Sequence, residues 1–451
     1  MTAANKIIFF LLCACLVVST LAYGTVHQPT IALFYFVIAG MLVIWAVDGF
    51  ASGSIKFSRS LIQLPIYLAA VYAFIQIIPF GTIAETAGLS GIPRTISLAP
   101  FATEAAGLHF AALGIFLSLA LAYIDSAARL RRMANVIIIF GAVFAFFAIL
   151  QSVLSPTKIY GIFERPSPFG SFVNRHNFAA YIEMTASIPL GLLFVGAVSR
   201  DKKLLYITGI TLMCVALLLS GSRGGFIALL AELILLIFLT TRSHGAKKIA
   251  LRVALSLMLI GAVIAGAFFV GGETSLSRFA ETAASKDITT NRTHIWAVTV
   301  KAIGGNLPFG GGLGAFAQAY TPYDDFNGLE RVEQAHNDYL QVLADGGVPG
   351  ALIGLSFLFL IYQNARKGIE AHNLFRRGIA IGAASGVFAI LIHSIFDFVL
   401  HTTAISILFL TLIAMLAAAL RKYPDDEKDP DHHEHRKRRS SSKVAEFSTK
   451  R

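Results

Sequence analysis

Arg223 stands in a polar break, residues 220–225, between two strongly apolar stretches. Its guanidinium is flanked by glycines that clear space around it, and its planar fork of donors could hold a diphosphate through paired hydrogen bonds. An arginine that only extends its charge to a membrane boundary would have the same surroundings. The break therefore indicates either a phosphate site or an interfacial anchor.

His336 lies near the start of residues 333–345, a predicted helix that Gly346 and Gly347 close. The positive end of a helix dipole disfavours the imidazolium, so a histidine in the first turn would stay neutral near pH 7 and suit a general base. A histidine that bonds a neighbouring loop at the membrane interface is the alternative. The preceding turn, residues 308–314, lacks the lysine of a P-loop, so its glycines are expected to allow close backbone approach.

Two further segments carry weaker candidates. Residues 172–177 could bind sugar hydroxyls through their amides and phosphate through Arg175, or could simply cap the helix that follows. His393, Asp397 and His401 are spaced by four and are predicted to share one helix face. That face could be a metal or proton-relay site, or a structural His–Asp pair.

The composition indicates that membrane helices position these side chains. Of 451 residues, 56% are apolar and only 14% are charged, and one span of hydrocarbon takes roughly 20 apolar residues. This composition excludes a large soluble catalytic domain, a disulfide-stapled secreted fold and a nucleic-acid-binding module, although the net charge is +11. The three cysteines show no disulfide or zinc spacing.

Twelve apolar stretches predict an all-α, polytopic fold of about 12 transmembrane helices. They cover residues 7–23, 30–47, 61–80, 105–124, 133–154, 178–198, 204–219, 226–239, 253–270, 348–362, 378–396 and 404–420. The first is predicted to be a span and not a signal peptide, because no clear small-residue cleavage site follows it. Glu183 and Glu232 lie within the sixth and eighth stretches, and the sequence assigns them no role.

The basic residues favour one orientation in the membrane. If the N-terminus is cytoplasmic, the inner segments hold seventeen Lys and Arg before the tail, whereas the short outer segments hold five. The positive-inside rule then places both termini in the cytoplasm and makes residues 271–347 one long outer loop. This loop is expected to be partly helical, with a first helix capped by Asn291.

We therefore expect four parts along the chain. Residues 1–270 carry nine transmembrane helices, residues 271–347 form the loop with the candidate catalytic helix, and residues 348–420 carry three more spans. Residues 421–451 form a disordered, charged cytoplasmic tail that anionic lipid headgroups would attract.

The polar motifs, taken in order, resemble the O-antigen ligase and O-antigen polymerase family of bacterial envelope membrane proteins. The matching segments are residues 172–177, 220–225, 292–296, 308–314, 336–340, 346–350 and 393–398. No single segment is specific, but the series in this order is. The resemblance covers about residues 172–400, and the first four spans match only in being hydrophobic.

The resemblance implies a metal-independent, inverting membrane glycosyltransferase of the bacterial inner membrane, without a cofactor and with its active site on the periplasmic side. It would take a glycan from undecaprenyl diphosphate, with His336 as the catalytic base and Arg223 and Arg292 holding the lipid diphosphate. The candidate contacts to the glycan or the diphosphate are Arg175, Asn177 and Asn337. Membrane lipids and other polysaccharide-assembly proteins are expected partners, and nucleic acid is not.

Ligase and polymerase share this chemistry and differ in the acceptor. A ligase would transfer to a hydroxyl of the lipid A core, and a polymerase of O-antigen or exopolysaccharide to the next carrier-linked repeat. An Arg-to-Gly spacing found in outer loops of some polymerases is absent, since Ile303 and Ala186 stand eleven positions after Arg292 and Arg175. This favours the ligase slightly.

Two other classes of protein fit twelve spans. A small-solute transporter would carry broken helices and paired halves around a midplane site. Here the informative polar residues gather at the outer face, and the two halves of the sequence do not match. A non-catalytic scaffold for polysaccharide assembly would keep its function after replacement of both His336 and Arg223.

Overall fold

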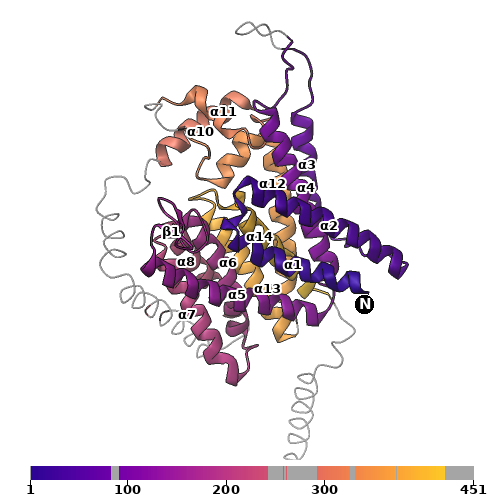
Figure 1. Cartoon of the computed structure of the whole chain (residues 1–451), viewed down its shortest axis with the longest axis vertical. Helices are drawn as coiled ribbons and strands as arrows, with labels where there is room; N and C mark the ends of the chain where they lie inside the picture. The colour runs from indigo at the N-terminus through magenta and orange to yellow at the C-terminus, as the bar shows by residue number, and fades with distance from the viewer. Residues whose placement is uncertain are drawn as a thin grey trace, which may run out of the picture.

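The computed structural model describes residues 2–82, 91–241, 292–325, 331–371 and 373–421, together with Leu257 and Gly261. In these ranges the chain is mostly helical, and two short strands pair antiparallel (Figure 1). The elements are α1 (Ala3–Leu21), α2 (Gln28–Ser52), α3 (Leu64–Gln76), α4 (Pro100–Tyr123), α5 (Ala127–Leu154), β1 (Lys158–Ile159), β2 (Phe163–Glu164), α6 (Arg175–Val195), α7 (Lys203–Leu219), α8 (Arg223–Thr241), α10 (Arg292–Asn306), α11 (Phe316–Tyr320), α12 (Asp338–Ile369), α13 (Leu374–His393) and α14 (Thr403–Ala419).

The apolar stretches of the sequence form the helices. Among the described residues, nine helices are long and apolar enough to cross a membrane, and Leu61–Gln76 and Thr403–Ala419 are shorter apolar helices. Together these coincide with eleven of the twelve predicted stretches. The ninth stretch, residues 253–270, lies outside the described residues except for Leu257 and Gly261, and so does the predicted tail beyond Arg421. The protein is a multi-pass membrane protein.

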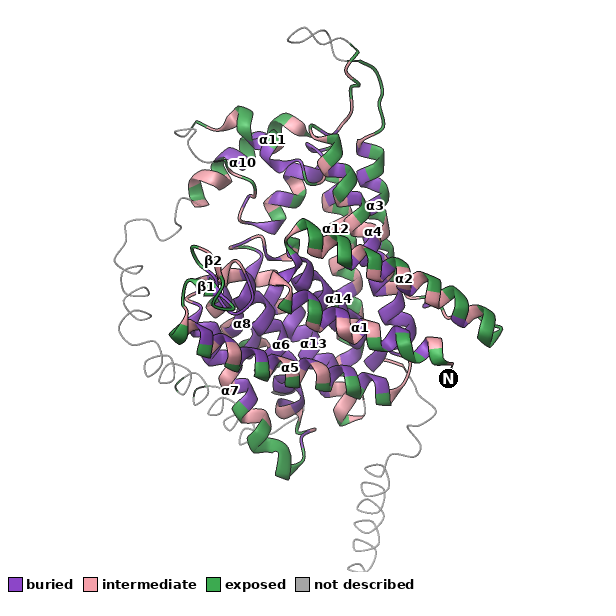
Figure 2. Cartoon of the chain, in the orientation of Figure 1, coloured by how far each residue is buried: buried purple, intermediate pink, exposed green. Residues whose placement is uncertain are grey.

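Helices α6, α13 and α14 form the centre of the bundle (Figure 2). All 17 residues of α14 and 17 of the 21 residues of α6 are buried, whereas only 4 of the 25 residues of α2 are. Small residues let α6 and α13 approach closely, since a Cβ on Gly382 would lie 2.6 Å from the carbonyl oxygen of Ser187. The apolar outer face of α2 suits contact with lipid.

Helices α10, α11 and the first half of α12 form a separate layer over one end of the bundle (Figure 1). This layer has a small apolar core of its own, formed by Val298, Phe316, Tyr320, Ala335 and Ala344. The prediction of a partly helical segment between the ninth and tenth stretches is therefore confirmed for residues 292–325 and 331–347. The predicted cap Asn291 and the rest of residues 271–347 lie outside the described residues.

The predicted start of the second helix in this layer is wrong. The helix α12 begins at Asp338 and not at Glu333, because the Asn337 side chain accepts hydrogen bonds from the backbone N–H groups of Tyr339 and Leu340, both at 3.0 Å. The predicted interruption at Gly346 and Gly347 is confirmed, because the backbone of Gly347, with φ 57° and ψ −149°, is not helical. Beyond this kink a second helical segment of α12 continues to Ile369.

The glycine-rich turn, residues 308–314, packs against the kink of α12. The N–H of Val348 donates to the carbonyl of Pro308 at 2.8 Å, and the N–H of Gly311 donates to that of Ala344 at 2.8 Å. A Cβ on Gly310 would lie 2.4 Å from the carbonyl oxygen of Asp345. The structure thus confirms that the glycines of this turn allow close backbone approach.

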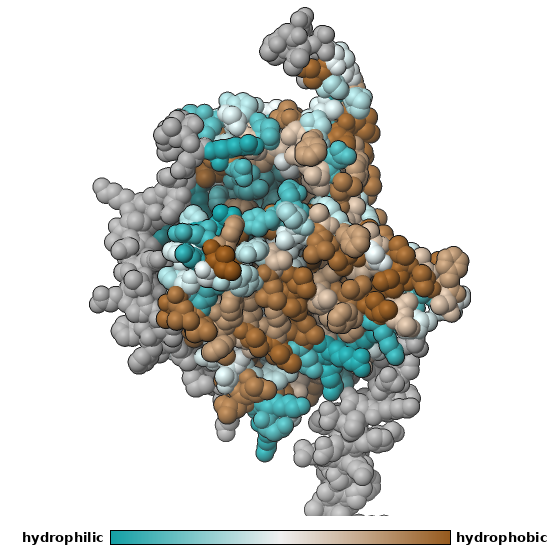
Figure 3. Space-filling model, in the orientation of Figure 1, coloured by the Kyte–Doolittle hydropathy of each residue, from teal (hydrophilic) through white to brown (hydrophobic). Residues whose placement is uncertain are grey.

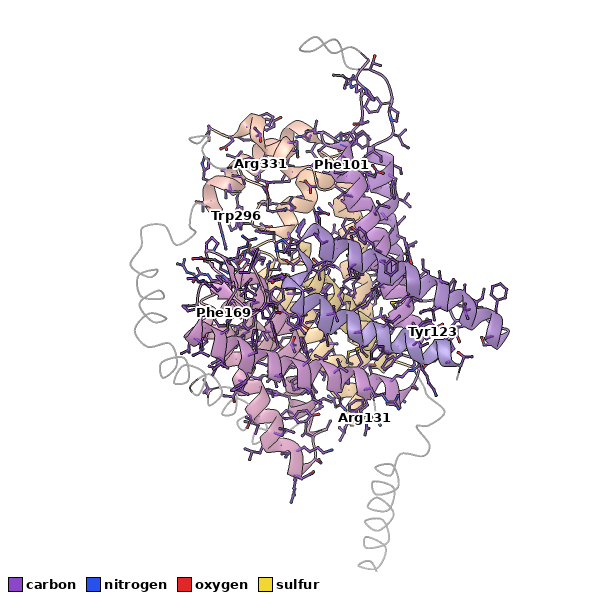
Figure 4. The ribbon with its side chains drawn as sticks, in the orientation of Figure 1. Phe101, Tyr123, Arg131, Phe169, Trp296 and Arg331 are labelled. Carbon is purple, nitrogen blue, oxygen red and sulfur yellow. The ribbon has the colours of Figure 1, made fainter. Side chains whose placement is uncertain are left out.

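The loops separate into two groups by their contacts. At one end Lys56 pairs with Asp125 at 2.8 Å, and Arg421 donates to the carbonyl of Leu121 at 2.5 Å. At the other end the N–H of Leu98 donates to Gly311 at 2.8 Å. Figure 4 shows Phe101, Trp296 and Arg331 at this second end and Tyr123 and Arg131 toward the first. This grouping agrees with the alternation of the predicted inner and outer segments, whereas the side of the membrane that each end faces stays a prediction.

Candidate functional site

Asp397 lies in the turn between α13 and α14 and occupies the centre of a polar cluster. The prediction that His393, Asp397 and His401 share a helix face is wrong, because α13 ends at His393. The chain then turns, so that each of the three side chains contacts a different partner. The backbone N–H of Asp397 still donates to the carbonyl of His393 at 3.1 Å, which places the carboxylate directly beyond the helix end.

Two helices and one loop supply the partners of the Asp397 carboxylate. His336 Nδ1 lies 3.1 Å from Oδ1, and Arg292 Nη2 donates to Oδ2 at 3.1 Å. His176 Nδ1 lies 3.8 Å from Oδ2. The side chain of Asp397 is only 2% exposed, and burial alone would raise its pKa. The hydrogen bond with His336 and the charges of His176, Arg292 and His336 outweigh burial and hold the pKa well below its usual range.

His336 precedes the helix instead of lying in its first turn. Its backbone adopts φ 49°, a left-handed conformation that is uncommon for a side chain other than glycine. Such strain persists where surrounding contacts fix it, and it is frequent at functional sites. The carboxylate of Asp397, and not the start of a helix, is therefore the group that orients this imidazole. The side chain remains 32% exposed, so a substrate can reach it.

Three arginines of the predicted site are each the first residue of a helix. Arg175 begins α6, Arg223 begins α8 and Arg292 begins α10. The free backbone N–H groups and the dipole at a helix start favour a bound anion, and the guanidinium adds a full charge.

Their neighbours hold the three helix starts together. His176 Nδ1 lies 2.9 Å from Oγ of Ser222, the residue before Arg223. The same Oγ accepts a hydrogen bond from the N–H of Gly225 at 3.2 Å and so caps α8. Since His176 also lies beside Asp397, it links the start of α8 to the carboxylate that binds Arg292.

The remaining predicted contacts have mixed accessibility. Arg175 is partly exposed, and its Nη1 lies 3.8 Å from where a Cβ on Gly221 would stand. Asn177 is only 7% exposed, within the first turn of α6. Asn337 is 9% exposed, and besides capping α12 its amide donates to the carbonyl of Ile395 at 3.0 Å. Its visible role is to join α12 to the turn that carries Asp397.

A buried Glu–His pair lies behind the Asp397 cluster. Nδ1 of His393 lies 3.1 and 3.2 Å from the two carboxylate oxygens of Glu183, and both side chains are fully buried. The space cleared by the glycines beside Arg223 belongs to His393, because a Cβ on Gly224 would lie 2.8 Å from its ring. The sequence singled out Glu183 and His393 separately, and the structure pairs them. Glu232 is also buried, without a hydrogen bond among the described residues.

Asp338 and His401 form a second His–Asp pair beside the first. His401 Nδ1 lies 3.1 Å from Oδ1 of Asp338, and Ser394 donates to Oδ2 at 2.7 Å. The backbone N–H of Leu400 approaches the same Oδ2 at 3.4 Å. The Asp338 carboxylate is thereby fixed to the turn that carries Asp397.

One group outside this cluster has residue types that bind metals. His294 Nε2 lies 3.7 Å from Asp324 and 3.5 Å from Asp325, and Lys301 pairs with the other oxygen of Asp325 at 3.1 Å. It is the one such group found within the described ranges. An ammonium group already balances the more exposed carboxylate, and the group does not contact Asp397 or His336 in any described interaction.

The cluster combines an oriented imidazole with convergent positive charge. Figure 3 shows hydrophilic surface between the α10–α11 layer and the helices beneath it. Such a site can bind a phosphorylated group and take a proton from a hydroxyl. Sequence reasoning missed His176 and the central place of Asp397. Both stood in motifs already singled out, but their partners lie at least 46 residues away along the chain.

Comparison with known families agrees with these motifs. The family model described as O-antigen ligase matches residues 208–355, about a third of the chain. This range contains Arg223, Arg292 and His336 but neither Arg175 nor Asp397. No curated protein matches the chain significantly. The family match supports assignment of the chain to the O-antigen ligase and polymerase family, and with it a glycosyltransferase-type membrane enzyme.

Proposed function

We propose that this protein, assigned to the O-antigen ligase and polymerase family, transfers a glycan from undecaprenyl diphosphate to an acceptor hydroxyl at the periplasmic face of the bacterial inner membrane. The acceptor of the ligase reaction is a sugar of the lipid A core. A polymerase of O-antigen or exopolysaccharide is the alternative, with carrier-linked glycan as acceptor. The reaction needs a base for the acceptor hydroxyl and positive charge for the departing diphosphate.

The observation that carries this proposal is the pair His336–Asp397. A carboxylate that accepts the Nδ1 proton at 3.1 Å selects one tautomer and leaves Nε2 as the proton acceptor. The acceptor oxygen then attacks the anomeric carbon, its proton passes to Nε2, and the bond to the diphosphate breaks with its electron pair leaving on the diphosphate. Attack opposite the leaving group inverts the anomeric centre.

The arginines at the helix starts provide the charge for the leaving group. Two N–H groups of Arg292 bind Asp397 and the carbonyl of Phe396, and a guanidinium has five donors. The rest can bind a phosphate oxygen, together with Arg223 and Arg175 at the starts of α8 and α6. These guanidinium groups would supply the positive charge that stabilises the departing diphosphate, and the proposed reaction uses no metal ion.

An in vitro transfer assay tests the proposal. Purified protein in detergent receives carrier-linked glycan alone or together with lipid A core, with a chelator present throughout. Product that requires the core acceptor supports the ligase, and a ladder from carrier-linked glycan alone supports the polymerase. If folded protein gives no product under either condition, the enzyme proposal is wrong, and a transporter or a scaffold becomes the better description.

A further inference from the structure

Two His–Asp pairs connect the same two chain segments. The segment before and at the start of α12 supplies His336 and Asp338, and the turn after α13 supplies Asp397 and His401. His336 binds Asp397 and His401 binds Asp338, each through Nδ1 at 3.1 Å. Each segment thus orients the imidazole of the other.

The ring of Phe398 lies between the two imidazoles. Its centroid is 4.8 Å from that of His336 and 6.4 Å from that of His401, and both contacts are edge-on. The ring is itself partly exposed. An imidazole, an aromatic ring and a second imidazole, each with some exposed surface, are therefore in contact in that order.

We propose that His401, Asp338 and Phe398 form the subsite for the acceptor sugar. This assignment rests on the proposed glycosyl transfer. Nε2 of His401 binds a hydroxyl of the acceptor, and the ring of Phe398 packs against an apolar face of the sugar. His336, on the other side of that ring, takes the proton of the hydroxyl that attacks.

The exposure of His401 distinguishes it from a structural histidine. His393 in the same turn region is fully buried against Glu183, whereas the side chain of His401 is 40% exposed. Asp338 engages Nδ1, and no described residue bonds Nε2. Ser394 and Leu400 hold the Asp338 carboxylate in place, and this carboxylate in turn orients His401. A histidine that only contacted solvent would not need to be oriented in this way. The His401–Asp338 pair has the same arrangement as the His336–Asp397 pair, with the carboxylate at Nδ1. A sugar hydroxyl is a suitable ligand for the Nε2 atom of His401.

The order of contacts separates the acceptor from the diphosphate. Arg292 contacts Asp397, Asp397 contacts His336, and the ring of His336 contacts Phe398, beyond which lies His401. In this series of contacts His336 stands between Arg292 and His401. A donor held by the arginines and an acceptor held by His401 would meet at His336, as the transfer requires.

Steady-state kinetics on the full-length protein in lipid nanodiscs tests this assignment, with the acceptor and donor concentrations varied separately. We expect His401→Ala to raise the acceptor KM at least about tenfold, which corresponds to about 1.4 kcal/mol, and to leave the donor KM within about twofold. Phe398→Leu should act in the same direction, and His401→Gln should restore part of the acceptor affinity. The matched control is His294→Ala, since His294 is 36% exposed and also lies beside aspartates.

A binding measurement separates this inference from the proposed function. Binding of a core-oligosaccharide glycolipid to wild type and His401→Ala is measured without donor. An inactive wild type that binds this glycolipid through His401 would contradict the transfer reaction and support the subsite. An active wild type whose acceptor KM and glycolipid binding are unchanged in both His401→Ala and Phe398→Leu would overturn the subsite. Equal changes in the acceptor and donor KM would also overturn it, because they indicate a general structural role.

Discussion

Asp397 holds its negative charge within a nearly closed space, because His336, Arg292 and His176 surround it. A carboxylate in this position can orient an imidazole, bind a guanidinium and remain ionised at the same time. The two roles are coupled through one side chain. A change at Asp397 should therefore affect both the base and the arginine that binds the leaving group.

Replacement of His336 by alanine should reduce transfer by about 10² to 10⁴-fold, because a positioned base contributes a factor of this size. Asp397→Asn should also reduce it. The double variant should lose more than His336→Ala alone, because Asp397 also binds Arg292, but less than the product of the two single losses, because Asp397 acts in part through that imidazole. Turnover by the four proteins measures this, with Asp325→Asn as an exposed control. Losses that multiply fully would contradict the coupling of Asp397 to His336.

The lowered pKa of Asp397 predicts how stability depends on pH. In the unfolded chain the pKa is about 3.9, and in the fold it is lower, so ionised Asp397 stabilises the fold above that pH. The stabilisation is lost as the pH falls through the folded-state pKa. Thermal unfolding of wild type and Asp397→Asn between about pH 3 and 7 should show a difference that shrinks toward acid. A constant difference would contradict this assignment.

Arg223→Lys should weaken binding of undecaprenyl diphosphate by about tenfold, since an ammonium cannot form the bidentate hydrogen bonds of a guanidinium. The matched control is Arg165→Lys, whose guanidinium lies 4.0 Å from the centre of the Phe163 ring and outside the cluster. Direct binding of the carrier lipid to both variants measures the effect. Unchanged affinity in Arg223→Lys would indicate that the arginine only anchors the helix at the interface.

Residue types and motif order were enough to single out His336 and Arg292, which the structure places on one carboxylate. They were not enough to identify that carboxylate. Asp397 lies 61 residues from His336 and 105 from Arg292, and no local pattern reports contacts at such separations. Its spacing from His393 and His401 fits a helix face, but the chain leaves the helix at His393.

At the scale of elements, α12 shows why the predicted start of a helix failed. Residues 333–337 continue a helical pattern, yet Ala335 donates to the side chain of Gln341 at 2.7 Å and Asn337 caps the helix later. The spans themselves were predictable, because length and hydropathy suffice for a helix in lipid. Caps and kinks depend on partners from distant segments, which hydropathy does not contain.

Gly347→Ala should destabilise the junction between α12 and the glycine-rich turn. A Cβ would lie 2.2 Å from the carbonyl oxygen of Pro308, and the backbone at φ 57° and ψ −149° is a conformation that other residues avoid at a cost of about 1–3 kcal/mol. Loss of thermal stability and of transfer should follow.

Gly354→Ala is the matched control within the same helix, since a Cβ there meets nothing within 4 Å. Alanine in a helix interior should stabilise it by up to about 1 kcal/mol relative to glycine. Equal thermal stability of Gly347→Ala and wild type would show that the junction tolerates a side chain, and the close approach would then lose its importance.

At the scale of the whole molecule, the two groups of loops allow a direct test of orientation. In a cysteine-free background, Arg331→Cys is expected to react with a membrane-impermeant thiol reagent added to cells with a permeabilised outer membrane. Lys202→Cys should react only after the inner membrane is opened. Both side chains are exposed, so access alone does not distinguish them. The opposite pattern would invert the predicted topology and place the His336 site in the cytoplasm.

The complete enclosure of α14 has a consequence for biogenesis. This helix is the last described span of the chain, yet all 17 of its residues are buried among α1, α4, α6, α12 and α13. During synthesis the earlier helices enter the bilayer before α14 does. Lipid or a translocation partner must then occupy the position of α14 in the bundle. The bundle can close only after α14 has been synthesised. Ribosomes that stop early would release an open assembly, which quality-control proteases of the membrane could recognise.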